Sequence, residues 1–188
     1  MKLLVVRHAI AMEREEFEFD ARKKAKEKGV DPELLANDEL RPLTADGVRK
    51  MRKNMQGLIR FVEEPDLMVT SPLVRAIQTA EILQASWSHL EATSVEELKP
   101  DSNPADFSKW LDTMKLSPDA IVVIIGHEPH LSSLVSWFLG GTSRPMVELK
   151  KGGACLIDFK AGVDKGRGRL SWLATPKMLA PKKIRPKK

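Results

Sequence analysis

The sequence predicts an α/β fold with a mainly parallel central sheet, and three apolar runs carry this prediction. Residues 2–6, 66–70 and 120–125 are rich in Val, Ile and Leu, and a segment with helical features follows each of them. Strands separated by helices form parallel sheets, in which neighbouring strands end at the same edge. We therefore expect ligand-binding groups directly after these runs.

Basic and imidazole side chains follow each apolar run, where packing alone gives no reason for them. Arg7 and His8 follow the first run, Arg75 follows the second and His127 follows the third. If the three strands are neighbours, two Arg and two His side chains converge at one edge of the sheet. This combination predicts a pocket for an anion.

The 188 residues suffice for one domain with a sizeable core, which we expect to span residues 1–175. The net charge of +5 comes from the end of the chain, because residues 181–188 hold five Lys or Arg and no acid. We interpret residues 176–188 as a basic, solvent-exposed tail. Nucleic-acid binding by this tail is not expected, because no aromatic residue interleaves its lysines.

The distribution of cysteine and of apolar residues predicts a cytoplasmic protein. Cys155 is the one cysteine of the sequence, so no intramolecular disulfide can form, as is typical of a reducing compartment. The first apolar run is too short for the core of a signal peptide, and Arg7 interrupts it. No stretch approaches the roughly 18 apolar residues of a membrane span, so we expect no membrane association.

Residues 11–40 are predicted to form a helical insertion. Acidic residues precede basic residues between positions 13 and 26, which suits the dipole of a solvent-facing helix. Gly29 is a good C-cap, and Asp31 and Pro32 are typical of a second, short helix start. Two interpretations stay open: a lid or partner-contact element, and a surface excursion without a function of its own.

Two further helices are predicted around the second apolar run. Thr44 is the expected N-cap of an amphipathic helix that ends near residues 63–65. Ser71 and Pro72 have the pattern of an N-cap and a first helical residue. This start would place Arg75 one turn into the helix, near its positive end, where anions are favoured.

The rest of the chain predicts two helices and a β-hairpin. Residues 104–115 should form a helix whose inward side chains are Phe107, Trp110, Leu111 and Met114. A helix after the third apolar run should end at the glycines of positions 140 and 141. Residues 153–159 and 170–174 are expected to be antiparallel strands. We interpret His89 and His130 as surface histidines.

Two arginines and two histidines around one anion favour phosphoryl transfer. Guanidinium groups match the oxygens of phosphate bidentately, and a histidine nitrogen can carry a phosphoryl group covalently. Nearby arginine charges favour the neutral imidazole, which has the free lone pair. The second histidine and the arginines would stabilise the charge on the transferring group, and this chemistry needs no metal.

Motifs for other chemistries are weak. Residues 127–130 superficially resemble the zinc motif His-Glu-x-x-His, but Leu131 stands where that motif requires its second histidine. The sequence has no P-loop, no Gly-x-Gly-x-x-Gly and no serine in a nucleophile-elbow pattern. We expect neither a metal nor a cofactor.

The order of four short motifs resembles the histidine phosphatase (phosphoglycerate mutase-like) superfamily. Arg7-His8-Ala9 is similar to its Arg-His-Gly signature, with Ala in the Gly place. Arg-Pro-Leu-Thr-x-x-Gly at 41–47, Ser-Pro-x-x-Arg-Ala-x-x-Thr-Ala at 71–80 and Gly-His at 126–127 follow in the family's order. The Arg-His-x-x-Ala opening and the Gly-His-x-Pro segment most resemble SixA-type phosphohistidine phosphatases.

The resemblance implies a three-layer α/β/α sandwich and assigns roles to residues. His8 would be the nucleophile, and Arg7, Arg75 and His127 would bind the phosphate. Glu97, with Glu96 beside it, is the nearest match to the general acid of the phosphoglycerate mutase-like branch. Arg41, at the expected rim of the pocket, Ser71 and Glu128 are the candidate substrate-binding residues.

Three functions remain as hypotheses. The resemblance implies hydrolysis of phosphohistidine on a protein, such as a histidine phosphotransfer domain or a phosphocarrier, through a covalent phosphohistidine intermediate. The first alternative is a phosphatase of small phosphate esters from the same superfamily. The second is a non-catalytic module that binds phosphoproteins, although pure binding would not require an unencumbered nucleophile.

Overall fold

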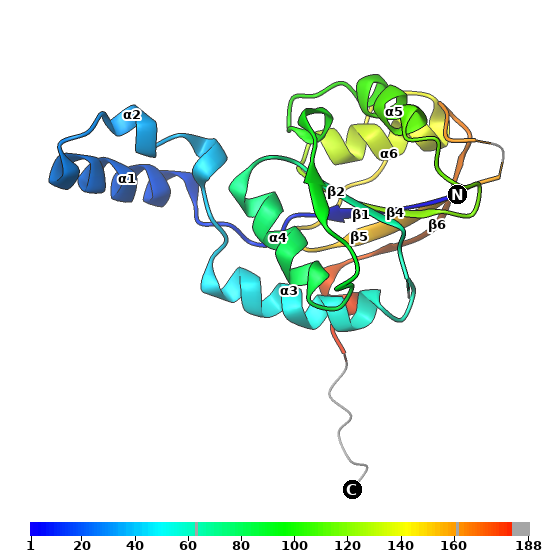
Figure 1. Ribbon diagram of the computed structural model, residues 1–188, viewed down its shortest axis with the longest axis horizontal. Coiled ribbons are helices and arrows are strands. Elements are labelled where there is room, and N and C mark those ends of the chain that lie inside the picture. The colour runs from blue at the N-terminus through cyan, green and yellow to red at the C-terminus, as the bar shows by residue number, and fades with distance from the viewer. Residues whose placement is uncertain (63, 161, 182–188) are drawn as a thin grey trace, which may run out of the picture.

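A six-stranded mixed sheet forms the centre of the protein in the computed structural model, which describes residues 1–62, 64–160 and 162–181 (Figure 1). The order of the strands is β3-β2-β4-β1-β5-β6. Their bounds are β1 (Lys2–Arg7), β2 (Leu67–Thr70), β3 (Ala92–Ser94), β4 (Ile121–Gly126), β5 (Ala154–Phe159) and β6 (Gly168–Ala174).

The first four strands of this order are parallel, and β5 and β6 are antiparallel additions. The three apolar runs of the sequence therefore lie side by side as β2, β4 and β1. The expected antiparallel strands at the end of the chain are also present, as β5 and β6. We call the edge where β1, β2 and β4 end the carboxyl edge.

Helices cover both faces of the sheet and complete the predicted three-layer sandwich. One face carries α3 (Ala45–Leu58), α4 (Val74–Gln84) and α7 (Pro176–Leu179), and the other carries α5 (Pro104–Thr113) and α6 (His130–Gly140). Alternate residues of β1 separate into the two cores: Leu4 and Val6 face the first layer, and Leu3 and Val5 face the second.

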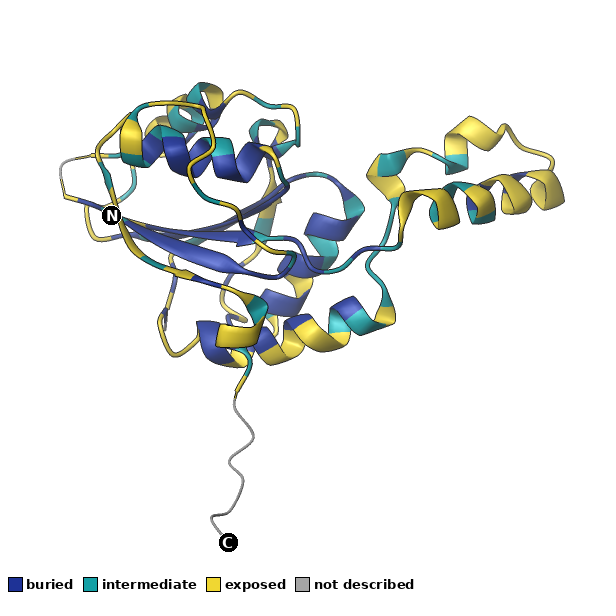
Figure 2. Cartoon of the chain, turned by 180° about the vertical axis from the view of Figure 1, so that it is seen from behind, coloured by how far each residue is buried: buried dark blue, intermediate teal, exposed yellow. Residues whose placement is uncertain are grey.

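Between β1 and α3 the chain leaves the body as an arm. The arm consists of α1 (Arg14–Lys28) and α2 (Pro32–Leu35), and η1 (Asp38–Leu40) connects it back to the body. Figure 1 shows the arm extending away from the sheet, and Figure 2 shows that most of it is exposed. Gly29 caps α1 in the left-handed conformation, as the sequence predicts.

Several predicted details differ in the structure. Ser71 is not the N-cap of α4, because the chain bends first and the helix begins at Val74, with Leu73 as its N-cap. Met114 follows the end of α5 and is 40% exposed, so it does not point inward. The three-residue strand β3 was not predicted, because Ala-Thr-Ser lacks the apolar character of an internal strand.

The expected tail starts with a helix that packs on the body of the protein. Its first residues form α7, which packs so closely on α3 that a Cβ atom at Gly57 would lie 2.0 Å from the carbonyl oxygen of Leu179. Residues 182–188 of the predicted tail lie outside the described residues. Among the helices that the structure describes, none is long and apolar enough to cross a membrane.

Gly47 fixes the distance between α3 and the loop that follows β1. Thr44 caps α3 as predicted, because its hydroxyl accepts a hydrogen bond from the Gly47 N–H at 2.9 Å. A Cβ atom at position 47 would lie 2.1 Å from the carbonyl oxygen of Ile10, so the motif requires glycine here. The loop after β1 is thereby held against the start of α3.

The substitution Gly47→Ala is expected to destabilise the protein by about 1–3 kcal/mol, because α3 must move away from the Ile10 backbone to make room. Urea unfolding measures this loss. Gln56→Ala, an exposed change on the same helix, should alter stability by less than about 0.5 kcal/mol. Equal stability of Gly47→Ala and the wild type would contradict the close approach.

Candidate functional site

The register between β1 and β4 brings the two predicted site histidines together. Arg7 pairs with Gly126 in the parallel ladder, so the next residue of each strand is a histidine. The rings of His8 and His127 lie with their centroids 4.9 Å apart at the carboxyl edge. Both residues are almost fully buried, with 6% of His8 and 1% of His127 exposed.

The hydrogen bonding of His8 selects one tautomer of its ring. Nδ1 lies 2.7 Å from the carbonyl oxygen of Ala9, which can accept a hydrogen bond but not donate one. The proton of the neutral ring is therefore on Nδ1, and the lone pair is on Nε2. The opposite nitrogen of the His8 ring is left free to bond with an electrophile.

Both predicted arginines reach the same region and keep buried donors without protein partners. Arg7 Nη1 donates to the carbonyl oxygen of Leu149 at 2.7 Å. Within the described part of the chain, no group accepts from Nε of Arg7, from Nε of Arg75 or from either ring nitrogen of His127. Buried donors of this kind cost free energy unless a ligand satisfies them, so their convergence favours an oxyanion.

Thr79 joins the segment after β1 to the helix that carries Arg75. Its hydroxyl accepts a hydrogen bond from the Ala9 N–H at 3.1 Å and donates one to the Arg75 carbonyl oxygen at 2.7 Å. The motif at 71–80 contains this threonine, but residue types alone did not indicate its function. Thr79 fixes the position of His8 relative to Arg75.

Asp38 is the site residue that the sequence analysis missed. Its carboxylate lies 3.1 Å from Nη2 of Arg75 and 2.8 Å from Nε of Arg41. Its main-chain carbonyl oxygen also accepts a hydrogen bond from Nη1 of Arg75 at 2.8 Å. Arg14, the first residue of α1, adds a third guanidinium at 3.3 Å. The carboxylate of Asp38, on η1, is thus the anion that pairs with these three arginines in the structure.

Arg41 and Glu39 fix η1 over this part of the carboxyl edge. Nη1 of Arg41 donates to the carbonyl oxygen of Met12 at 2.7 Å, and 13% of its side chain is exposed. Arg41 therefore lies beside Asp38 and is tied to both ends of the arm. Glu39 pairs with Lys99 at 3.0 Å, which connects η1 to the segment after β3.

Burial and neighbouring charges keep the site histidines neutral. Burial lowers the pKa of His8 to about 3, and the charges of Arg75 and Arg7 act in the same direction. Burial also lowers the pKa of His127 to about 2, with His8 and Arg75 contributing. Burial alone would raise the pKa of Asp38, but the hydrogen bond from Arg41 and the charge of Arg75 lower it.

Three other predicted site residues have different surroundings. Ser71 is fully buried at the end of β2, and its hydroxyl accepts a hydrogen bond from the Leu73 N–H at 3.4 Å. The carboxylate of Glu128 accepts hydrogen bonds from the main-chain N–H groups of Ser132 and Leu149, so it fixes the main chain at these two residues. Glu97 is half-buried on η2 (Glu96–Leu98), where the structure shows no partner for it among the described residues.

His130 is buried, which corrects its interpretation as a surface histidine. It is the first residue of α6, with 2% exposed, and neither ring nitrogen has a partner within the described ranges. Burial lowers the pKa of His130 to about 4. His89 is exposed, as predicted. No group of three His, Cys, Asp or Glu side chains among the described residues is arranged to hold a metal ion.

The buried histidines predict a loss of stability at mildly acidic pH. Because their pKa values are lowered in the folded state, the unfolded chain binds more protons below its ordinary histidine pKa of 6.5. Stability is therefore fully present above pH 6.5 and falls toward pH 4. The expected loss is at most about 1.4 kcal/mol per pH unit for each imidazole that stays neutral.

Urea unfolding at pH 7 and pH 5 measures this effect, and His130→Leu removes one buried imidazole while keeping both rings of the His8–His127 pair. The variant should show a smaller difference between the two pH values than the wild type. His89→Gln, on the surface, serves as the control and should behave as the wild type. An unchanged pH dependence in His130→Leu would contradict the neutral state of this ring.

Asp38→Asn is expected to strengthen binding of inorganic phosphate by about tenfold. The substitution removes a negative charge beside Arg75 and Arg41, while the main-chain carbonyl of residue 38 still orients Arg75. Titration calorimetry with phosphate measures the change. Asp31→Asn, on the exposed arm, is the control. Weaker binding by Asp38→Asn would show instead that the carboxylate is needed to orient the arginines.

Comparison with known proteins agrees with this geometry. Residues 38–100 match the model of the histidine phosphatase superfamily (branch 1). An uncharacterized protein of Picosynechococcus sp. is 30% identical over 185 residues, which cover 96% of this chain and 100% of that protein. Phosphohistidine phosphatase SixA of Escherichia coli K12 is 27% identical over 145 residues, which cover 75% of this chain and 85% of that protein.

Solved structures share the fold over nearly the whole chain. A SixA protein histidine phosphatase complexed with tungstate has a TM-score of 0.69 and 23% identity, with 94% of this chain and 98% of that chain covered. A phosphoserine phosphatase from Entamoeba histolytica has a TM-score of 0.62 and 18% identity, with 95% and 98% covered. These solved structures show that the chain has the same fold. The family-model match identifies the chain as a member of the histidine phosphatase superfamily.

Proposed function

We propose that the protein is a phosphatase that hydrolyses phosphohistidine on a protein, with His8 as the nucleophile. The observation that carries this proposal is the free Nε2 of a neutral His8, beside a second neutral histidine and two arginines with unpaired buried donors. Nucleophile and oxyanion donors are the two parts that covalent phosphoryl transfer needs.

In the first step, Nε2 of His8 attacks the phosphorus atom of the substrate. The new bond joins this nitrogen to phosphorus, and the bond from phosphorus to the substrate's imidazole nitrogen breaks. The leaving imidazole takes up a proton and departs. Arg7, Arg75 and His127 hold the three equatorial oxygens while their charge is redistributed. Burial of these groups strengthens the interaction, because little water screens it.

In the second step, water attacks the phosphorus atom of phosphorylated His8 and releases inorganic phosphate. The His8 nitrogen regains its lone pair, so the enzyme returns to its starting state. Glu97 remains the candidate for the proton transfers of both steps, since it lies on η2 beside the end of β2. Asp38 is less suited to donate a proton, because its neighbouring arginines lower its pKa and keep it ionised.

The similarity to SixA favours a phosphohistidine protein as the substrate. Phosphohistidine phosphatase SixA of E. coli aligns with three quarters of the chain. The arm next to the carboxyl edge is also exposed, so it offers a surface that a protein partner could contact (Figure 2). We also propose that the protein is located in the reducing environment of the cytoplasm.

A small phosphate ester is the second candidate substrate. It is favoured by structural neighbours that include a phosphoserine phosphatase and an α-ribazole phosphatase from Shigella flexneri, which have the same fold. The low exposure of His8 and His127 also suits a small substrate more readily than a bulky one. A non-catalytic phosphoprotein-binding module would make no use of the free His8 Nε2.

The test is hydrolysis of a phosphohistidine-bearing transfer domain by the purified protein in the presence of a chelator. The wild type should release phosphate, and His8→Ala should be slower by on the order of 10³-fold or more, because the nucleophile is lost. Quenching a ³²P-labelled reaction in alkaline detergent, which preserves the acid-labile P–N bond, should show the label on His8. The control is His89→Ala, which changes an exposed histidine.

Each other outcome selects a different function. If the wild type cleaves p-nitrophenyl phosphate or phosphoserine but not phosphohistidine, the small-ester phosphatase is correct. If it binds phosphate and hydrolyses none of these substrates, the protein is a binding module. If His8→Ala keeps full activity, the assignment of the nucleophile is wrong.

A further inference from the structure

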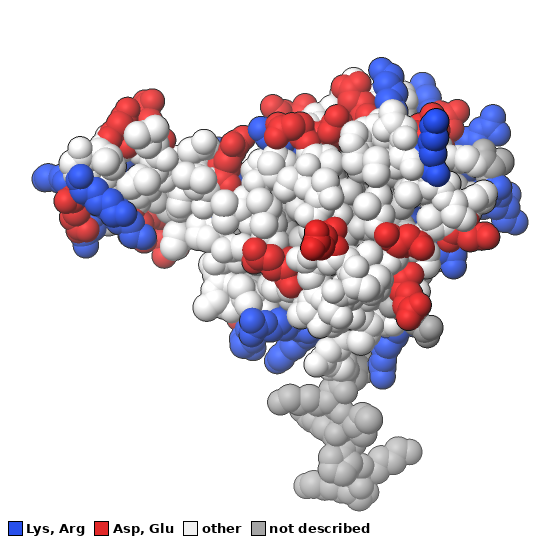
Figure 3. Space-filling view, in the orientation of Figure 1, with Lys and Arg blue, Asp and Glu red and all other residues white. Residues whose placement is uncertain are grey.

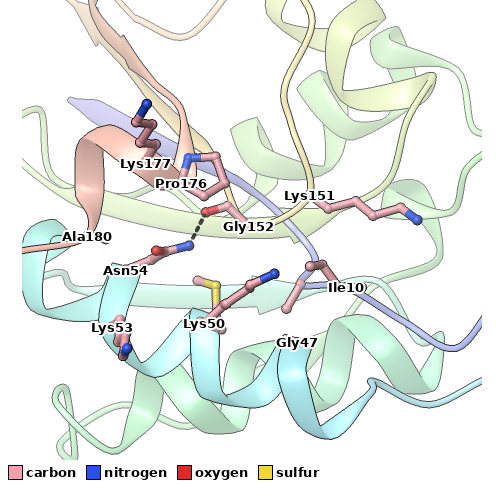
Figure 4. A pocket seen from close by; sticks show the side chains of 12 residues that line it. Ile10, Gly47, Lys50, Lys53, Asn54, Lys151, Gly152, Pro176, Lys177 and Ala180 are labelled. Carbon is pink, nitrogen blue, oxygen red and sulfur yellow. Dashed lines mark hydrogen bonds between the residues drawn. The ribbon is translucent and has the colours of Figure 1, made fainter.

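A cavity lies beside the candidate site, on the face of the sheet that α3 covers. Its volume is about 340 Å³, at the lower end of the range for small-molecule pockets. Four segments line it: the loop after β1, α3, the loop before β5 and α7. Figure 4 shows α3 on one side of this cavity, with Gly152 and Pro176 on the other.

The chemistry of this cavity is an apolar interior with a basic rim. Ala9, Met51 and Pro176 contribute apolar surface. Four lysines also line the cavity, and among the described residues no Asp or Glu does. They are Lys50, Lys53, Lys151 and Lys177. We call this cavity with its four lysines the lysine pocket.

Two of the four lysines have no acidic partner among the described residues. Lys50 pairs with Asp46 at 2.7 Å, and Lys151 pairs with Glu13 at 3.7 Å. Lys53 and Lys177 are exposed, and neither forms an ion pair within the part of the chain that the structure describes. Figure 3 shows basic side chains gathered over α3. The rim therefore carries an excess of positive charge that an acidic partner would neutralise.

The lysine pocket is directly connected to the backbone that holds His8. Ala9 lines the pocket, and its carbonyl oxygen accepts the hydrogen bond from His8 Nδ1. Gly152 also lines it, and its N–H donates to the carbonyl oxygens of Arg7 and His8 at 3.1 and 3.0 Å. A protein that places a phosphoryl group at His8 would thus lie next to the lysine pocket.

The polar groups of the pocket distinguish between a protein and a small anion as the occupant. A dedicated small-molecule site usually has buried polar groups that converge on the ligand. Here the buried Asn54 already donates from Nδ2 to the Gly152 carbonyl oxygen at 3.1 Å (Figure 4). The charges lie on the exposed rim instead, which is typical of the edge of a protein–protein interface.

We infer that the lysine pocket is a docking site for an acidic segment of the protein substrate, with an apolar side chain in the cavity and carboxylates on Lys53 and Lys177. The inference rests on the proposed function and adds the charge of the substrate's surface to it. The sequence also makes this region basic. Ala180 lines the pocket, and the residues that follow it in the sequence include five more Lys or Arg.

The experiment compares the wild type with the double variant Lys53→Glu/Lys177→Glu on two substrates. The KM for the phosphohistidine transfer domain should rise about tenfold or more at about 0.05 M salt, with kcat nearly unchanged. The difference should shrink at about 0.5 M salt, because salt screens exposed charges. The kinetics of p-nitrophenyl phosphate should not change, which also shows that the variant is folded.

A matched control reverses two charges elsewhere. Lys109→Glu/Lys160→Glu alters two exposed lysines of α5 and of the end of β5, outside the lysine pocket, and should leave both substrates unaffected. An unchanged KM of the pocket variant for the transfer domain overturns the inference. An equal rise in KM in the control variant also overturns it, since the effect would then reflect total charge.

A binding measurement separates this inference from the proposed catalytic function. Fluorescence anisotropy with a labelled peptide rich in Glu and Leu should show binding to His8→Ala as tight as to the wild type, and at least tenfold weaker binding to the pocket variant. Such binding can be observed even if the protein fails to hydrolyse phosphohistidine. If ATP binds in the pocket and the peptide does not, a small organic anion is the ligand and the inference is wrong.

Discussion

The parallel register between β1 and β4 is the constraint on which the rest of the site depends. It sets Arg7 opposite Gly126, and the two histidines that follow then meet at 4.9 Å. A slip of one residue would exchange the side chains of β1 between the two cores and move His8 away from His127. The apolar residues on both faces of β1 therefore specify the position of His8 as strongly as any contact that His8 makes itself.

Burial of unpaired polar nitrogen atoms at the carboxyl edge costs free energy, and a bound anion would remove this cost. Nε of Arg7, Nε of Arg75 and both nitrogens of His127 lack protein partners within the described residues, although a protein core normally satisfies such groups. Burial of apolar side chains in the two cores of the sandwich offsets this cost. An oxyanion would satisfy several of them at once, so the free energy of binding includes the removal of this penalty. Asp38 already satisfies the outer nitrogens of Arg75 and leaves its inner Nε free.

The sheet and the four central side chains were predictable because they depend on local patterns. An apolar run followed at once by Arg or His is visible in the sequence, and parallel strands bring such positions together. Asp38 was not predictable in this way, because its contact with Arg75 spans 37 positions and it stands in a charged insertion without periodicity. Its spacing of three residues before Arg41 was the available signal, since the two side chains do pair at 2.8 Å. The burial of His130 depends on the tertiary packing of α6, which no local pattern expresses.

η1 lies between the arm and the site, and its side chains contact both. His8 and His127 are nearly inaccessible, yet the proposed mechanism requires a phosphoryl group to reach bonding distance of the His8 ring. Two acidic side chains of η1 pair with basic groups near the site: Asp38 pairs with Arg75, and Glu39 pairs with Lys99. A phosphate dianion carries more charge than a single carboxylate and can compete for the same guanidinium groups. Arg14 ties α1 to Asp38, so a change in the pairing of Asp38 acts on the base of the arm as well. A phosphate bound to Arg75 would therefore be coupled to the arm through the carboxylate of Asp38.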